Sequence, residues 1–202
     1  FYAKAATDIE YDFFGEFEEV EGIHNRRDYD LGSHTKGPKN KDSTAKLDYK
    51  DAETGESFIP FVIETAMGVN RAMMAVLDNA YTEEKLENGD TRTVLKMKPS
   101  LSPVKAAVVP LARNVPELLK TSEKIAADLR RLNLGRIVVE NSGNIGKNYR
   151  RHDEIGTPVC ITIDHQTLED GMVTLRDRDT MKQTRVKIAD VPAKIKSIIE
   201  EA

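Results

Sequence analysis

The pattern of apolar residues changes at Pro99–Pro103, and this change constrains the fold more than any other feature of the sequence. Before it, short apolar segments are interleaved with acidic residues, as in strands that expose one face. After it, apolar runs alternate with stretches of helical periodicity, beginning at Ala106–Pro110. We therefore expect a strand-rich α+β domain over residues 1–98. An α/β domain with a small mixed sheet should follow over residues 99–202.

The two expected domains differ in charge. Residues 1–100 hold 13 Lys and Arg against 20 Asp and Glu, whereas residues 101–202 hold 17 against 14. This weak basic excess does not by itself predict a nucleic-acid surface. No apolar run reaches the ~18 residues of a membrane span. The single cysteine, Cys160, excludes an intramolecular disulfide and fits a reducing, cytoplasmic compartment. Because the sequence starts at Phe1 without a methionine, we expect it to be part of a longer chain.

Local patterns predict the main connections. The polar residues 31–56 favour a loop or insertion, because nothing in them forms an apolar face. Residues 57–63 favour a strand, and Val69–Tyr81 favours a helix with an apolar stripe. Glu83–Asp90 is predicted to be a charged loop. Asn114, with Glu117 three residues later, has the spacing of a capping box at a helix start.

Glu64 is the only charged residue among residues 57–70. A charge in such an apolar run is rare unless it has a partner. Arg71 follows in the first turn of the expected helix, where a cation opposes the helix dipole. These two unfavourable choices indicate a binding site; the equally weighted alternative is that the two residues pair with each other or with neighbours. Glu19 and Glu21, whose spacing puts both on one face of a strand, are a second candidate; an exposed acidic face is the simpler explanation.

The segment from Ser142 to Lys147 resembles a phosphate loop only superficially, since it lacks both nucleotide-loop spacings. Around Tyr149, a basic cluster is compatible with contacts to RNA backbone and with base stacking. A solvated helix face is the more common explanation for such a cluster. The four histidines show no metal-ligand spacing, and no nucleophile–base pair is evident. The cluster contains Arg136, Lys147, Arg150 and Arg151.

Taken together, several segments in order resemble the C-terminal part of a class II glycyl-tRNA synthetase of the dimeric type. The first expected domain carries Thr7–Phe13, Glu19–Arg26, Ile59–Glu64 and Gly68–Arg71. The second carries Leu101–Lys105, Gly146–Pro158, Leu168–Gly171 and Arg176–Thr180.

The resemblance implies that residues 1–98 are the end of an antiparallel class II catalytic core, with its strand–helix motif 3 at residues 58–81. Residues 99–202 would be the anticodon-binding domain. The implied reaction is attachment of glycine to tRNA(Gly) through a glycyl-adenylate made from ATP with Mg²⁺. The upstream core motifs are not in this sequence, so we expect a piece that is inactive alone. A homodimer is expected through that upstream part.

The resemblance also implies site residues, none of which acts as an acid or base. No protein-held metal ion is implied. Glycine would be bound by Glu64, Thr65, Ala66, Met67, Gly68, Glu21 and Arg26. ATP would be bound by Glu19, Val20, Gly68, Val69, Asn70 and Arg71. Contacts to tRNA would come from Lys147, Arg150, Arg151, Arg176 and Arg178.

Two departures from the family pattern keep an alternative open. Thr65 and Ala66 stand where the family commonly has Pro-Ser, and Asn70 replaces a frequent Asp. They motivate a non-catalytic nucleic-acid-binding relative, such as a polymerase accessory subunit. The intact Glu64 and Arg71 argue against it, since a binding module needs neither. A weaker hypothesis is that the second domain alone binds RNA.

Overall fold

A computed structural model describes residues 2–36 and 46–200. The chain divides into two compact units between Asp78 and Asn79. This division places residues 79–98 with the second unit, although the sequence pattern changes only at residues 99–103. The compact unit takes in these residues because they form a hairpin that contacts helix α4. None of the described helices is long and apolar enough to cross a membrane.

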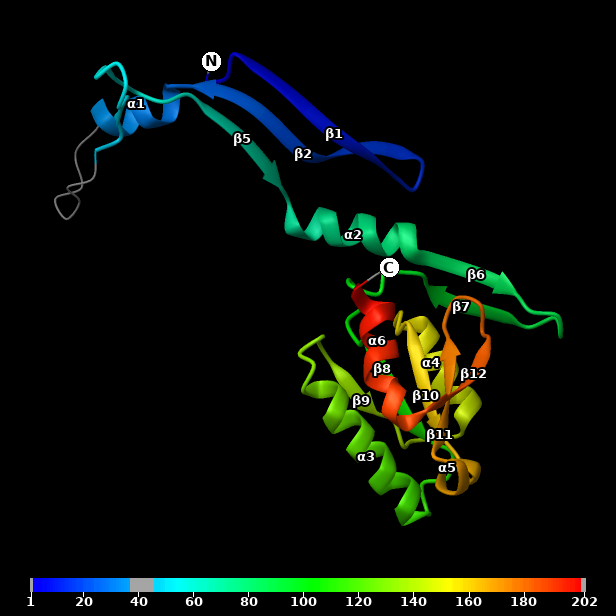
Figure 1. Ribbon diagram of the computed structural model, residues 1–202. Coiled ribbons are helices and arrows are strands. Elements are labelled where there is room, and N and C mark those ends of the chain that lie inside the picture. Colours follow the sequence, from blue (N-terminus) through cyan, green and yellow to red (C-terminus); the bar gives the residue numbers. More distant parts are fainter. Residues whose placement is uncertain (1, 37–45, 201–202) are drawn as a thin grey trace. The chain divides into compact units, whose positions relative to one another are not determined.

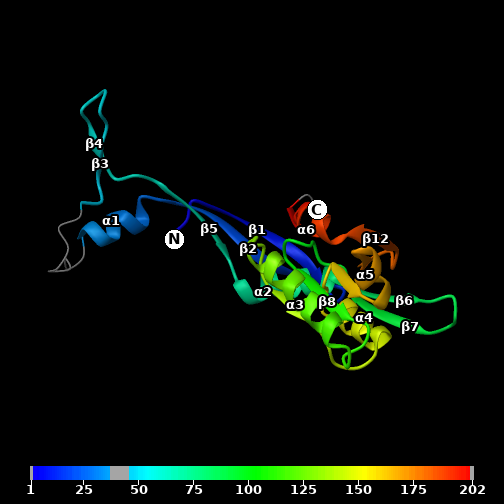
Figure 2. The ribbon, with the colours of Figure 1, turned by 60° about the horizontal axis from the view of Figure 1, so that its bottom comes forward.

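The first unit is an antiparallel sheet with β2 between its two neighbours (Figure 1). Helix α2 follows β5 after the single residue Gly68. The small β3–β4 hairpin and α1 lie at the end of the sheet away from the β1–β2 turn (Figure 2). The bounds are β1 (Ala5–Phe13), β2 (Glu16–Arg27), α1 (Tyr29–Lys36), β3 (Tyr49–Lys50), β4 (Ser57–Phe58), β5 (Val62–Met67) and α2 (Val69–Ala80).

The second unit contains the β6–β7 hairpin and a mixed five-stranded sheet of order β12-β11-β10-β8-β9. Strands β10, β8 and β9 are parallel, and β11 and β12 add an antiparallel edge. The bounds are β6 (Tyr81–Lys85), β7 (Thr91–Leu95), β8 (Ala106–Pro110), α3 (Pro116–Arg130), β9 (Ile137–Val139), α4 (Ile145–Glu154), β10 (Val159–Ile163), α5 (His165–Asp170), β11 (Met172–Asp177), β12 (Gln183–Lys187), a short 3-10 helix (Ile188–Asp190) and α6 (Val191–Glu200).

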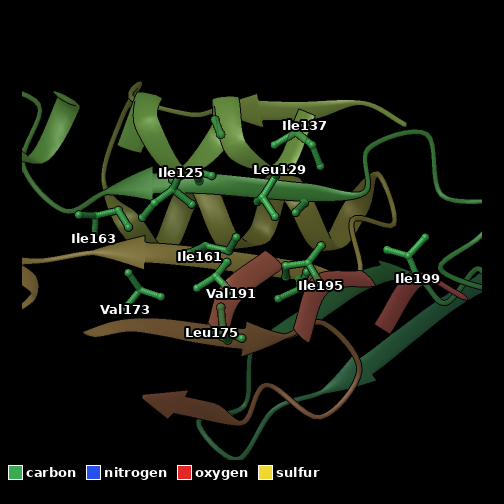
Figure 3. Close-up of a cluster of buried hydrophobic side chains, with 14 of the residues drawn as sticks. Ile125, Leu129, Ile137, Ile161, Ile163, Val173, Leu175, Val191, Ile195 and Ile199 are labelled. Carbon is green, nitrogen blue, oxygen red and sulfur yellow. The ribbon is translucent and has the colours of Figure 1, made fainter. Parts of the chain in front are cut away.

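Helices cover both faces of this mixed sheet. On one face, α3 and α6 bury the main core, in which Leu129, Ile161 and Ile195 are fully inaccessible (Figure 3). On the other face, α4 places Ile145 and Tyr149 against Ala107, Val109 and Cys160. The central strands are buried on both faces, which explains why their sequences are apolar without alternation.

Four local expectations were wrong, the first being the strand predicted at residues 57–63, which residues 59–61 divide between β4 and β5. The predicted loop 31–56 is helical up to residue 36 and has a strand at residues 49–50; its residues 37–45 lie outside the described residues. The predicted charged loop Glu83–Asp90 begins as strand β6. Helix α3 starts after Val115 with Pro116 in its first turn and without a side-chain cap, so the capping box at Asn114 does not form.

Candidate functional site

Strands β2 and β5 bring three polar side chains together on the first sheet. His24 lies directly opposite Glu64 in the antiparallel register, and Arg26, at a register shift between Asn25 and Arg27, reaches the same carboxylate. Arg26 Nη1 donates to Glu64 Oε2 at 2.8 Å, and His24 Nδ1 lies 3.6 Å from the same oxygen. The Glu64 side chain is 37% exposed. The lone acid of the apolar segment therefore pairs with neighbours on β2.

Arg26 is held by a second carboxylate. Its Nε and Nη2 donate to the two oxygens of Asp30 at 2.6 Å each, in the first turn of α1. These hydrogen bonds raise the pKa of the guanidinium and lower the pKa of Asp30. The ring of Tyr2 lies 4.8 Å from the Arg26 guanidinium carbon, in cation–π geometry. The sequence analysis did not identify Asp30, His24 and Tyr2 as site residues. The available signal was the close spacing of His24 and Arg26 along one strand.

Small residues lie beside this charged group. Gly22 is paired with Ala66, next to the His24–Glu64 pair. A Cβ on Gly22 would come within 3.1 Å of His24 Cε1 and 3.3 Å of Glu19 Oε1. The face thus has no long side chain at either position, and a larger residue at position 22 would crowd His24 and Glu19.

A register shift brings Glu19 to this face. The β1–β2 pairing slips between Ile9 and Glu10, so that Val20 has no Cα partner. Such a bulge resets the alternation along β2 and places Glu19 with Gly22 and Glu64. Glu21 pairs with Met67 on the opposite face.

Arg71 occupies the third position of α2 and extends toward β2. It donates to the backbone carbonyl of Glu19, and its Nη2 lies 3.5 Å from Glu18 Oε2. The side chain is 48% exposed. Glu64 and Arg71 therefore each pair with neighbours on β2, one of the two forms of the alternative to a binding site, and not with each other.

The predicted glycine residues are divided between two faces of the sheet. Glu64 and Ala66 share one face, where Arg26 contacts Glu64, whereas Thr65, Met67 and Glu21 share the other, because successive strand residues alternate. Gly68 lies in the turn before α2. Among the predicted ATP residues, Val69, Asn70 and Arg71 form the first turn of α2, and Val20 is the bulged residue of β2.

The predicted tRNA residues are also divided. Lys147, Arg150 and Arg151 are exposed on α4, with Arg150 bound to Asp90 and Arg151 to Glu140. Arg176 and Arg178 are buried, at 6% and 2% exposure. Buried guanidiniums need internal partners, and both have them, so we assign these two arginines to the interior of the unit.

The base-stacking expectation at Tyr149 is not supported. The Arg176 guanidinium carbon lies 4.6 Å from the centroid of the Tyr149 ring, and the hydroxyl is 2.5 Å from Thr162 Oγ1. Burial raises the pKa of this phenol. At the start of α4, Asn144 Oδ1 accepts from the backbone N–H of Lys147 and caps the helix. Among the described residues, no three His, Cys, Asp or Glu side chains gather as a metal-binding group.

Comparison with known proteins identifies both units. Residues 105–198 match the family model described as "Anticodon binding domain". The glycine–tRNA ligase of Deinococcus radiodurans is 51% identical in an alignment that covers 94% of this chain and 42% of that protein. The glycine–tRNA ligase of Thermus thermophilus is 48% identical, over 94% of this chain and 41% of that protein.

This chain is a homologue of the glycine–tRNA ligases. It spans about two fifths of the length of the curated ligases it matches. The resemblance drawn from the sequence is thereby confirmed.

A solved structure supports the expected fold class. The prolyl-tRNA synthetase from Cryptosporidium parvum superimposes with a TM-score of 0.68 at 15% identity, over 99% of this chain and 38% of that one. At this identity the likeness concerns the fold alone. The expected class II architecture, an antiparallel core segment followed by a mixed α/β domain, is confirmed.

Proposed function

We propose that the protein to which this chain belongs attaches glycine to tRNA(Gly), after activating glycine with the magnesium complex of ATP. The homology to glycine–tRNA ligases supports the reaction. The ion pair between Arg26 and Glu64 is the structural observation that carries the proposal. A free amino acid offers an ammonium and a carboxylate on adjacent carbons, and this pair offers the complementary carboxylate and guanidinium.

Glycine binding would exchange one ion pair for two. Glu64 and Arg26 contact each other at 2.8 Å, and Asp30 holds Arg26 in place. Glycine inserted beside them places its ammonium on Glu64 and its carboxylate on Arg26. Because Asp30 and Tyr2 also contact Arg26, the guanidinium keeps its orientation during this exchange. We infer that Asp30 positions Arg26.

Activation of glycine needs alignment and charge neutralisation more than proton transfer. The glycine carboxylate attacks the α-phosphorus of ATP, pyrophosphate leaves, and no side chain has to remove a proton. Arg71, at the start of α2 and half exposed, is suited to contact the nucleotide phosphates. Gly22 and Ala66 place no long side chain beside Glu64. A site that selects glycine must exclude larger amino acids by contact, because each methylene provides only about 1–3 kcal/mol of discrimination.

The test is ATP–pyrophosphate exchange by the full-length protein with single amino acids. We expect exchange that depends on glycine. Exchange stimulated by proline, threonine or histidine and not by glycine would overturn the proposal.

A measurement of ATP binding distinguishes the proposed enzyme from the alternative, a non-catalytic nucleic-acid-binding relative. We expect the full-length protein to bind ATP and its Arg71→Ala variant to bind ATP about tenfold more weakly. An absence of ATP affinity in both proteins would favour the accessory role instead. We further propose that the exposed residues Lys147, Arg150 and Arg151 of α4 contact tRNA, in keeping with the anticodon-binding family of residues 105–198.

A further inference from the structure

Strand β7 places one arginine in the interior of the second unit. Residues Arg92 and Val94 both point inward and are 3% and 0% exposed. A buried guanidinium is costly unless all of its donors are paired. The hydrogen-bond partners of Arg92 therefore show which elements its buried side chain connects.

Every N–H donor of Arg92 has an acceptor. Nε and Nη2 donate to Glu84 on β6, the neighbouring strand of the hairpin. Nη1 donates to Asp153 Oδ2 of α4 at 3.2 Å and to the carbonyl oxygen of Arg178 at 2.7 Å. Nη2 also reaches the carbonyl oxygen of Asp179 at 3.4 Å. One side chain thus joins the hairpin to α4 and to the β11–β12 connection.

Asp153 is held from the opposite side by Arg176 of β11. The two form a bidentate pair, with Nη1–Oδ1 and Nη2–Oδ2 distances of 2.8 Å and 2.9 Å. The Asp153 side chain is 2% exposed. Arg176 also covers the ring of Tyr149, one turn earlier on α4. We call Arg92, Asp153 and Arg176 the arginine clamp.

Backbone contacts tighten the same junction. Arg178 donates to the carbonyl oxygens of Gly156 and Met97, both at 2.8 Å. Gly156, which follows α4, has a φ of +75°, and a Cβ there would lie 2.5 Å from Met97 Cε and 3.0 Å from the Leu95 carbonyl. The end of α4 and the end of β7 are therefore in a contact that only glycine permits.

The hairpin is also continuous with α2. Helix α2 ends at Ala80, and β6 begins at Tyr81 without an intervening residue (Figure 1). The backbone N–H of Lys96 donates to the carbonyl oxygen of Ala80 at 2.7 Å, which closes the hairpin on the last residue of the helix. The hairpin and the last residue of α2 are thus joined both through the chain and by this hydrogen bond.

We infer that the arginine clamp makes the β6–β7 hairpin move with α4, and that Arg92 is a positioning residue for the tRNA-dependent step. This inference rests on the proposed function. The exposed residues of α4 and the clamp residue Asp153 belong to one helix, so tRNA bound on α4 acts on the hairpin through Asp153 and Arg92. Loosening the clamp leaves glycine activation intact and weakens the effect of the bound anticodon on transfer of glycine to tRNA.

The experiment compares Arg92→Lys with wild type in the full-length enzyme. Lysine keeps the charge but cannot reproduce the planar fork that joins Glu84, Asp153 and the two carbonyls. Three rates are measured: glycine-dependent ATP–pyrophosphate exchange without tRNA, charging of whole tRNA, and charging of an acceptor-stem minihelix without an anticodon. The matched control is Arg131→Lys, because Arg131 is 77% exposed and pairs with Asp128 on its own helix.

We expect kcat for whole tRNA to fall about tenfold in Arg92→Lys, with exchange and minihelix charging changed by less than about twofold. An equal fall in all three rates, or no change in any, would overturn the clamp's role. Should Arg92→Lys fail to fold, Arg176→Lys loosens Asp153 from the other side and is judged by the same criteria. A wild-type enzyme without glycine-dependent exchange would instead overturn the proposed function, and the inference with it.

Discussion

Arg26 and Glu64 meet from adjacent antiparallel strands, with Nη1 2.8 Å from Oε2, on a face where Gly22 and Ala66 place no long side chain beside them. The two side chains present the two charges that a free amino acid requires. Substitutions at this pair and in the second unit should therefore have separate, measurable effects.

Removing the charge of Glu64 should weaken glycine binding. In Glu64→Gln of the full-length protein, we expect the KM for glycine in ATP–pyrophosphate exchange to rise about 100-fold, because a charge-assisted hydrogen bond to the ammonium is lost. The KM for ATP should change little. Glu53→Gln, an exposed acid in the β3–β4 connection, is the matched control. An unchanged KM for glycine would show that Glu64 does not hold the substrate.

Neutralising the exposed face of α4 should weaken tRNA binding. Arg150 and Arg151 are 54% and 51% exposed, and each has one carboxylate neighbour. For the double variant Arg150→Gln, Arg151→Gln we expect at least about tenfold weaker tRNA binding and a salt dependence reduced by about one unit per lost phosphate contact. Arg131→Gln serves as the control. Equal affinities at every salt concentration would locate the tRNA surface elsewhere.

The stability of the second unit should decrease as the pH falls below about 6.5, because of His152. Burial lowers the pKa of this imidazole, whose Nδ1 contacts Thr157 while Nε2 has no partner. The neutral form is therefore favoured in the folded chain. Its contribution to stability is fully present above the ordinary histidine pKa of about 6.5, and it is lost as the pH falls through the lowered pKa of the folded chain.

Urea unfolding of the 202-residue chain at several pH values measures this contribution. We expect the free energy of unfolding to fall below pH ~6.5 in the wild type and to be flatter in His152→Gln. Carboxylates with lowered pKa, such as Glu84 and Asp164, titrate below their ordinary range near pH ~4 and so act outside this window. Parallel curves for the two proteins would contradict the prediction.

Truncating the shared carboxylate of the arginine clamp should destabilise the second unit. Asp153→Ala leaves Arg92 and Arg176 buried without their common counter-charge, and we expect a loss of about 3–5 kcal/mol in urea unfolding. Asp128→Ala removes an exposed partner of Arg131 and should cost less than about 1 kcal/mol. Similar losses in the two variants would show that Asp153 is not a buried counter-charge.

Much of the fold could be predicted wherever periodicity was strong. Helix α2 and strand β8 lie close to their predicted ranges, because an apolar stripe or run has few ways to be buried. Strand β6 was missed because Thr82 and Glu84 point inward, and an inward glutamate is acceptable only with Arg92 and Lys96 beside it. No local pattern contains that information.

The candidate site, too, could be predicted only in part, because local patterns carry no information on tertiary partners. The sequence singled out Glu64 and Arg71 as unusual charges, and the resemblance added Arg26. Neither the sequence nor the resemblance placed Glu64 and Ala66 on a different face of the sheet from Thr65 and Met67. Strand alternation assigns faces only once the partner strand and its register are known. The bulge at Val20 likewise moved Glu19 away from the face of Glu21.

The order of apolar and polar residues, by itself, determined that a strand-rich segment precedes an alternating α/β domain, since each pattern can bury its apolar atoms in only one kind of layer. Tertiary structure alone decided which arginines of the second unit are on the surface. Arg150 and Arg151 remain in water, whereas Arg92, Arg176 and Arg178 are inside. All five carry the same charge, and a guanidinium enters the interior only where carboxylates and carbonyl oxygens from distant segments converge on its donors.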